Sequence, residues 1–204
     1  MKKINGFWKE IDMCGRYVID IEEKEIREII KEAVKNTQEE VKTGEIFPTN
    51  NAPILAKENE KITPQIMKWG FLNFKGSGVI INSRVETALY KKMFKESLLH
   101  RRCVIPSTGF FEWKKDSREK FLFKNPASNL LYMAGFYNDF FVDGKKSRRF
   151  VILTTSANGS IREVHDRMPL VLEKDQVDIW LDNSEKSLYL LNITPVSLEK
   201  IKVD

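Results

Sequence analysis

Short runs of strand-forming residues, each ended by turn residues, recur along most of this chain and constrain its fold more than any other feature. The runs are rich in branched and aromatic side chains, and turn residues interrupt them about every ten positions. This spacing is typical of a strongly bent sheet or a partly closed barrel. We therefore predict an α+β fold with a bent, barrel-like, mostly antiparallel β-architecture and peripheral helices. Strands are expected at residues 14–19, 53–57, 65–69, 79–82, 103–106, 110–114, 120–123, 130–137 and 149–156.

Helices are expected in four intervals. The first begins at Asp20, which can cap it, and extends to about Lys35. The other three fit residues 85–99, 160–164 and 174–181. The apolar residues of the first helix recur at helical spacing and form one stripe, made of Ile26, Ile29, Ile30, Ala33 and Val34. No internal repeat or long linker divides the chain, so we expect an N-terminal extension over 1–12 and a single domain over 13–204.

The charge of the chain gives a mild indication of a polyanionic partner. Its 204 residues include 34 Lys and Arg against 29 Asp and Glu, a formal net charge of +5. Most lysines within 21–45 and 57–61 stand beside glutamates, which is typical of a solvated surface. The arginines are more informative, because most stand next to aromatic or turn residues; they are Arg16, Arg84, Arg101, Arg102, Arg148, Arg149, Arg162 and Arg167.

Composition also excludes several classes of protein. No run of about 18 apolar residues is present, which excludes a transmembrane helix. The basic first dozen residues lack the apolar centre of a secretory signal. With only two cysteines, Cys14 and Cys103, and no export signal, we expect a reducing, cytoplasmic environment. No C-x-x-C pair or His/Cys cluster is present, so we expect neither a metal nor an organic cofactor.

Glu112 is the first candidate for proton transfer. It is the only charge in the segment Thr-Gly-Phe-Phe-Glu-Trp at 108–113. A carboxylate among bulky apolar neighbours loses solvation and suits a general acid near neutral pH. The alternative is an outward-facing strand glutamate between inward-facing Phe111 and Trp113, which strand alternation alone would produce.

The two histidines are weighed in the same way. His165 stands in Val-His-Asp-Arg-Met-Pro at 164–169, where Asp166 can orient its imidazole for acid–base work. The alternative is a structural histidine. His100 stands at an expected helix end, where a cation interacts favourably with the helix dipole, and we assign it a structural role.

Asn82 and Arg84 follow a strand-like run and precede an expected helix. Such a junction presents side chains and backbone donors to anions, so a phosphate is a natural ligand. The alternative is ordinary helix capping by Asn82 or Ser83.

Cys14 gains interest from Met13, which precedes it. If residues 1–13 were removed, Cys14 would carry a free α-amine, which titrates at about 7.7–8.0 in model peptides and is partly unprotonated at neutral pH. An amine and a thiol on adjacent carbons trap aldehydes, because the amine forms a Schiff base and the thiol then closes a thiazolidine ring. The alternative is a buried cysteine that acts as a small hydrophobic residue.

Taken together, these segments resemble the SRAP (SOS response-associated peptidase) family, which senses and crosslinks abasic sites. The resemblance extends from residue 13 nearly to the end of the chain. Each motif is modest alone, but six in the same order are highly specific. The motifs are Met-Cys-Gly-Arg-Tyr at 13–17, Met-Lys-Trp-Gly-Phe at 67–71, Asn-Ser-Arg-Val-Glu-Thr at 82–87, Arg-Arg-Cys-Val-Ile-Pro-Ser-Thr-Gly-Phe-Phe-Glu-Trp at 101–113, Ala-Gly-Phe-Tyr at 134–137 and His-Asp-Arg-Met-Pro at 165–169.

The resemblance implies a single α+β domain and a role for each matching residue. Catalytic roles are implied for Cys14 as the crosslinking residue, Asn82 as the asparagine that holds the catalytic end, Glu112 as the proton-handling carboxylate, and His165 as its partner in ring opening and Schiff-base chemistry. The DNA-binding residues that it implies are Arg84 and Arg167 at phosphates, Arg16 as a third arginine, and Trp69 and Trp113 as an aromatic wedge for base stacking.

The chain departs from the family pattern at its start, because thirteen residues precede Cys14 and an amide nitrogen cannot form a Schiff base. Three explanations are open. Translation can begin at Met13, the extension can be removed by autoproteolysis, or the extension can remain and block crosslinking. We favour the first, because Met13 supplies its own start codon.

The leading hypothesis is a monomeric, cytoplasmic enzyme, nucleoid-associated after DNA damage, that crosslinks abasic sites in single-stranded DNA. The alternative enzyme is a thiol peptidase with Cys14 as nucleophile, His165 as base and Asn82 as orienter, but it leaves the arginines and tryptophans without a role. A third reading, a non-enzymatic single-strand-binding module, leaves the Cys/Glu/His set unexplained. No membrane partner is expected.

Overall fold

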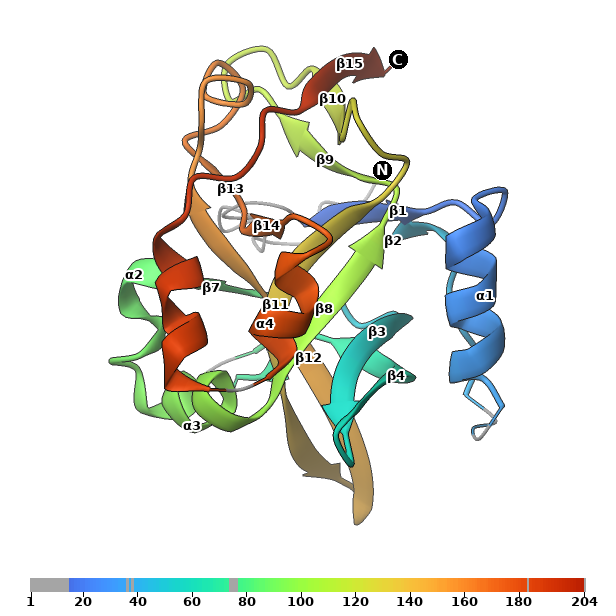
Figure 1. Ribbon diagram of the computed structural model, residues 1–204. Helices are drawn as coiled ribbons and strands as arrows, with labels where there is room; N and C mark the ends of the chain where they lie inside the picture. Colours follow the sequence, from blue (N-terminus) through green and yellow to red (C-terminus); the bar gives the residue numbers. More distant parts are fainter. Residues whose placement is uncertain (1–14, 36, 38, 74–76, 183, 204) are drawn as a thin grey trace.

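Five strands close into a barrel at the centre of the fold, which the computed structural model describes for all residues except 1–14, 36, 38, 74–76, 183 and 204 (Figure 1). Their order is β12–β4–β3–β8–β11, and β11 pairs back with β12. Within this ring the pairing of β4 with β12 is parallel, and the other pairings are antiparallel. The strands are β3 (Asn51–Glu58), β4 (Lys61–Trp69), β8 (Arg102–Ser107), β11 (Leu131–Val142) and β12 (Lys145–Ser156).

Further strands extend this barrel and form a second sheet beside it. Short strands β13 (Arg167–Pro169) and β7 (Asn82–Arg84) both pair with β12, and β14 (Val171–Leu172) pairs with β11. The second, antiparallel sheet has the order β15–β10–β9–β1–β2, and β5 (Phe71–Leu72) pairs with β6 (Val79–Ile80). The predicted bent, barrel-like and mostly antiparallel architecture is confirmed. The bounds in the second sheet are β1 (Arg16–Ile19), β2 (Gly44–Ile46), β9 (Gly109–Trp113), β10 (Lys120–Lys124) and β15 (Glu199–Val203).

Aromatic side chains pack against one another in the hydrophobic core. Trp69 stacks on Phe150 with ring centroids 6.4 Å apart, and Phe71 packs edge-on against Phe140 at 5.0 Å. The backbone of β11 also approaches its neighbours closely at Gly135, where a Cβ would lie 2.5 Å from the carbonyl oxygen of Val151. Only glycine fits that position, because a side chain there would force the closing strands apart.

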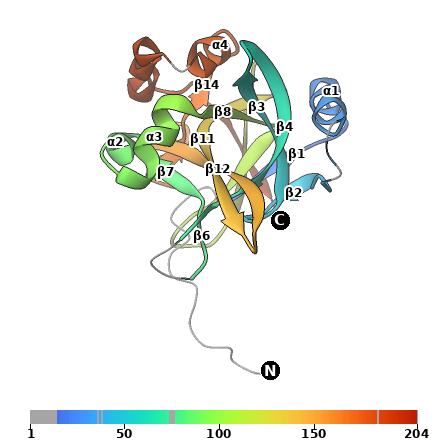
Figure 2. The same ribbon diagram turned by 90° about the horizontal axis from the view of Figure 1, so that it is seen from below.

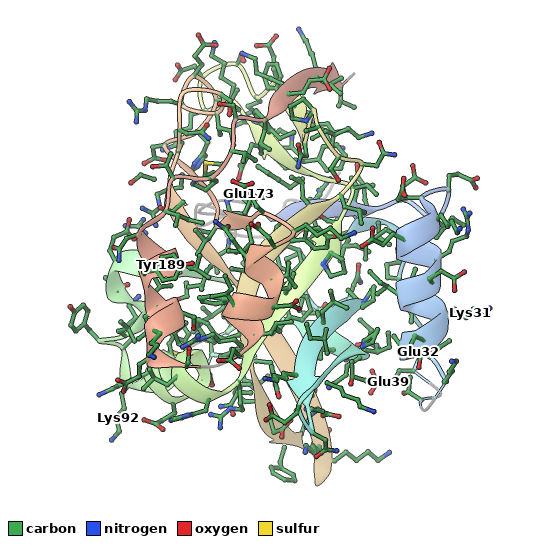
Figure 3. All side chains as sticks on the ribbon, viewed as in Figure 1. Lys31, Glu32, Glu39, Lys92, Glu173 and Tyr189 are labelled. Atoms are coloured by element: carbon green, nitrogen blue, oxygen red, sulfur yellow. The ribbon has the colours of Figure 1, made fainter. Side chains whose placement is uncertain are left out.

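Helix α1 (Lys24–Ala33) covers one side of the barrel, but it begins four residues later than the sequence pattern predicts. The carboxylate of Asp20 accepts the backbone N–H of Glu22 at 3.0 Å, so Asp20 fixes a turn before the helix instead of capping it. The buried stripe consists of Ile26, Ile29 and Ala33, whereas Val34 is exposed. Lys31 points away from the barrel, in agreement with a solvated outer face (Figure 3).

The single helix predicted over 85–99 is wrong, because the chain forms two helices there. These are α2 (Val85–Ala88) and α3 (Lys92–His100), and Lys91 between them has an extended backbone. The break redirects the chain so that Phe94 and Leu98 of α3 become buried. His100 ends α3, as predicted.

At the C-terminal side, α4 (Gln176–Leu181) matches the predicted helix except for its first turn. Residues 160–164 form hydrogen-bonded turns instead of the predicted helix. A 3-10 helix, η1 (Glu185–Asn192), follows α4 and was not predicted. Helices α2, α3 and α4 lie on adjoining sides of the barrel, and α1 lies apart from them (Figure 2). None of the helices in the described part of the chain has the length and apolar character that a membrane span requires.

Candidate functional site

Glu112 lies on β9 and is only 4% exposed. It pairs with Phe121 of β10 across the antiparallel ladder, and its neighbour Phe111 pairs with Arg16 of β1. The outward-facing alternative for Glu112 is therefore wrong. Buried carboxylates are common at functional sites, which keeps Glu112 a candidate for proton transfer.

Cys14 lies outside the described residues. In the sequence it stands two residues before Arg16, which begins β1, and β1 pairs with β9, the strand that carries Glu112. The other cysteine, Cys103, is fully buried in β8, and burial raises the pKa of its thiol, which makes it unreactive.

His165 lies two residues before Arg167, the first residue of β13, and is 9% exposed. Its Nδ1 accepts the backbone N–H of Arg167 at 3.1 Å and also lies 3.1 Å from Oδ1 of Asp166. One protonation state cannot use both contacts. The neutral ring accepts from Arg167 and carries its proton on Nε2, whereas the imidazolium donates from Nδ1 to Asp166. The surroundings of Nδ1 thus support both states that an acid–base group must visit.

The segment that carries His165 also approaches the end of β9. Lys115, two residues after that strand, places its Nζ 3.6 Å from Oδ1 of Asp166. Both groups are well exposed, so this ion pair contributes little stability. Its value is geometric, because it brings the ends of the Glu112 and His165 segments together.

Asn82 and Arg84 are the two ends of β7, which runs parallel to β12. Arg84 occupies the N-cap position of α2 and makes no side-chain capping bond there. The capping alternative for Asn82 and Ser83 is wrong, because their strand register places both before the cap. Arg84 is exposed, as a phosphate-binding arginine must be.

Arg167 is 9% exposed and already paired. Its two terminal nitrogens bind the carboxylate of Glu86, with Nη2 at 2.8 Å from Oε2, and Nη2 also donates to the carbonyl of Thr154 at 2.7 Å. The hydrogen bond from Arg167 lowers the pKa of Glu86 against the opposing effect of partial burial. Arg167 is thus not a free cation in this structure, and its expected phosphate contact stays a prediction.

Aromatic rings and cations gather where β1, β9 and β10 meet. The guanidinium of Arg16 lies 4.3 Å from the ring centroid of Phe47 and 5.1 Å from that of Trp113. Lys120 lies 3.8 Å from the ring of Phe111, and Glu45 pairs with both cations. Trp113 is half-buried, so part of its surface remains available to a ligand.

Trp69 requires a correction. It is fully buried, its Nε1 donates to the carbonyl of Ile81 at 3.0 Å, and its ring packs against Tyr17 and Phe150. A ring covered on all sides cannot stack on a base. Trp69 therefore supports the barrel wall, and of the two predicted tryptophans Trp113 alone is accessible.

Residues 13–203 match the family described as SOS response associated peptidase (SRAP). This chain belongs to the SRAP family.

Two curated relatives carry the same printed function. The chain is 27% identical over 176 residues to the abasic site processing protein YedK of Escherichia coli, with 83% of this chain and 79% of the relative covered. It is 31% identical over 185 residues to the abasic site processing protein YoqW of Bacillus subtilis, with 83% and 80% covered. A crystal structure of a protein from Bacteroides thetaiotaomicron has the same fold, with a TM-score of 0.78, 20% identity, and 94% and 92% coverage.

The structure also corrects the prediction that arginines next to aromatic or turn residues in the sequence bind DNA. Arg102 is buried, binds the carbonyl of Leu98 at 2.8 Å, and burial lowers its pKa to about 10. Arg148 pairs with Asp139 and Glu58. These arginines stabilise the fold, so proximity to aromatic residues in the sequence did not identify DNA-binding residues.

Three participants at the candidate site were missed, namely Phe47, Glu86 and Lys120. Phe47 reaches Arg16 only because β1 pairs with the distant β2, for which the sequence carries no local signal. Lys120 faces Trp113 across the neighbouring strands β9 and β10, so their closeness in the sequence was the available signal. Glu86 stands inside the motif at 82–87, and its position two residues after Arg84 was the available signal.

One groove, of about 590 Å³, lies between the β3–β4 hairpin and the α4–η1 region. Its lining includes Lys57, Ile62, Ile179 and Tyr189, and none of the nine predicted site residues. The chemistry of the site therefore does not depend on this groove.

Proposed function

We propose that this SRAP protein recognises abasic sites in single-stranded DNA and captures them covalently through Cys14. The observation that carries the proposal is the burial of Glu112 on β9, beside the strand that follows Cys14 in the chain. The names of the relatives, both abasic site processing proteins, support the same conclusion.

The reaction uses the α-amine and the thiol of Cys14 once residues 1–13 are absent. The amine attacks C1′ of the ring-opened sugar, and loss of one water gives an imine. The thiol then adds to the same carbon while its proton moves to the nitrogen, so a C–S bond forms and the C=N bond becomes single. The product is a thiazolidine, and neither an oxidant nor a reductant is required.

His165 and Glu112 divide the proton transfers. An abasic sugar is mostly a closed hemiacetal, and opening it requires a proton at the ring oxygen and removal of one from the C1′ hydroxyl. The imidazolium of His165, whose Nδ1–H donates to Asp166, can give its Nε2 proton to the ring oxygen, and Glu112 as a carboxylate can accept the hydroxyl proton. The Asn82 side chain is proposed to hold the catalytic end of the chain, at Cys14.

Arg84 and Arg16 grip the phosphates that flank the lesion, and Trp113 offers a stacking surface. Contacts of these kinds position a strand without reading its sequence, because phosphates and ring faces are common to all nucleotides. The missing base leaves space for protein side chains at the lesion. We expect the protein to act as a monomer in the cytoplasm, at the nucleoid after DNA damage.

The test compares two forms of the protein, one with residues 1–204 and one that begins at Cys14. Each is incubated with single-stranded DNA that contains one abasic site and analysed on a denaturing gel. We expect a covalent species only from the form that begins at Cys14, and none with intact DNA. If that form gives no covalent species, the proposal is wrong.

Two variants of the form that begins at Cys14 resolve the chemistry. Cys14→Ser keeps the amine but not the thiol, so it should give an adduct only when borohydride reduces the imine. Glu112→Gln should slow crosslinking by about 10²-fold or more while it keeps DNA binding. A covalent species from the form with residues 1–204 would reveal removal of its own extension, and cleavage of added peptides would favour the thiol peptidase instead.

A further inference from the structure

Glu86 and Arg167 join two segments that carry different parts of the candidate site. Glu86 belongs to α2, directly after Arg84, and Arg167 begins β13, directly after the His165–Asp166 pair. The two segments flank opposite edges of β12, where Thr154 pairs with Arg84 on one side and Ser156 pairs with Arg167 on the other. The ion pair therefore bridges the end of β12 from edge to edge.

The burial of the two side chains is unequal. The Arg167 side chain is 11% exposed, whereas that of Glu86 is 49% exposed. A buried guanidinium depends on its partner, because removing the carboxylate leaves a charge that water cannot reach. The position of the buried guanidinium therefore depends on the Glu86 carboxylate.

The main chain of Arg167 contacts His165, so the position of Arg167 affects the position of the imidazole. Its backbone N–H donates to Nδ1 of His165 at 3.1 Å, and this bond keeps the proton of the neutral ring on Nε2. The side chain of Arg167 is also tied to the carbonyl of Thr154. A shift of residue 167 would lengthen the bond to the imidazole and release the ring.

We propose that Glu86 is a positioning residue that holds Arg167 and, through the main chain of Arg167, orients the imidazole of His165. The inference rests on the proposed function of His165 but is tested without DNA.

Nitrogen-15 NMR of the imidazole rings tests the proposal directly, since the chain contains only two histidines, His100 and His165. Nδ1 and Nε2 shifts of neutral His165 should report the Nε2–H form in the unaltered protein. Glu86→Ala should shift the ring toward a mixture of both tautomers, with His100 unchanged. The matched control is Glu163→Gln, which removes an exposed ion pair with Lys200 in the same segment and should leave both rings unchanged.

An unchanged His165 spectrum in Glu86→Ala overturns the proposal. If Glu86→Ala does not fold, Glu86→Gln keeps the size of the side chain and one acceptor, and it should give a smaller change in the same direction. An unchanged spectrum in folded Glu86→Gln then also overturns it. If the form that begins at Cys14 gives no crosslink, the proposed function is wrong. The NMR spectrum would still show whether Glu86 determines the tautomer of His165, because it is recorded without DNA.

Crosslinking kinetics supply a second readout. In Glu86→Ala we expect the rate at saturating DNA to fall by about tenfold, since a misplaced proton donor loses part of its 10²–10⁴-fold contribution. The DNA dissociation constant should stay the same or decrease, because a negative charge has been removed. A merely destabilised protein would lose affinity as well as rate, and parallel losses would contradict the positioning role.

Discussion

Nδ1 of His165 lies 3.1 Å from Oδ1 of Asp166, so the carboxylate is placed to accept a hydrogen bond from the imidazolium. The side chain of Asp166 is 70% exposed, and it also meets Lys115. Asp166 therefore stabilises the charged ring from the solvent side, whereas the backbone of Arg167 stabilises the neutral ring from inside. Removing the contact with Asp166 should therefore affect the imidazolium, and removing the contact with Arg167 should affect the neutral ring.

We expect Asp166→Asn to slow covalent capture by about three- to tenfold, because solvent screens an exposed carboxylate and limits its contribution. The change should be largest at low ionic strength and small in high salt. Single-turnover crosslinking at saturating DNA measures it. Lys115→Ala is the matched control, since it removes the other partner of Asp166 without touching the ring, and a loss of rate as large as that of Asp166→Asn would contradict the assignment.

Arg84 should contribute to the salt dependence of DNA binding. Arg84→Ala removes an exposed cation, so the slope of log affinity against log salt should fall in magnitude by about one. Lys31→Ala, on the outer face of α1, should leave the slope unchanged (Figure 3). Fluorescence anisotropy with a labelled single strand at several salt concentrations provides the slopes. A slope for Arg84→Ala equal to that of the unaltered protein would remove Arg84 from the phosphate contacts.

The fold was predictable from local sequence where strands and turns have their own signals. Most barrel strands were expected within a few residues. The length of the β11–β12 hairpin was underestimated, because the expected strands stop at 137 and resume at 149. Asp143 and Gly144 mark its turn, and both adopt positive φ, as a tight hairpin turn requires. Edge strands β2 and β15 were missed, because the three residues of β2 and the five of β15 acquire strand structure only from their partners.

The candidate site was predictable only in part, because sequence shows residue type and position but not what covers a side chain. Burial of Glu112 agreed with its apolar neighbours. Trp69 and Arg167 occupy motif positions as expected, yet one is enclosed by the barrel and the other is paired with Glu86. Such pairings join residues 81 positions apart and depend on strand register, which no local pattern encodes.

Trp113 and Trp69 should respond oppositely to truncation. Trp113→Ala should weaken single-strand binding by about 1–3 kcal/mol, the contribution of one stacked base, and leave stability nearly unchanged. Trp69→Ala should instead destabilise the fold by about 3–5 kcal/mol, because it opens a cavity against Phe150 and Tyr17. Denaturant unfolding and DNA titration of both variants separate the effects. Unchanged DNA affinity in Trp113→Ala would exclude it as a stacking surface.

Acid should weaken the Glu86–Arg167 pair in a defined pH range. The pKa of Glu86 is lowered from 4.5 in the folded protein, so the folded state binds fewer protons there than the unfolded state. The stabilisation from this pair is therefore fully present above the unfolded value and is lost as pH falls through the lower, folded value. Melting temperatures of the unaltered protein and Glu86→Gln should differ at pH 7 and converge below pH 4.5. Glu163→Gln supplies the reference for an exposed pair, and a gap between the unaltered protein and Glu86→Gln that stays constant down to acidic pH would show that the charge of Glu86 does not hold Arg167.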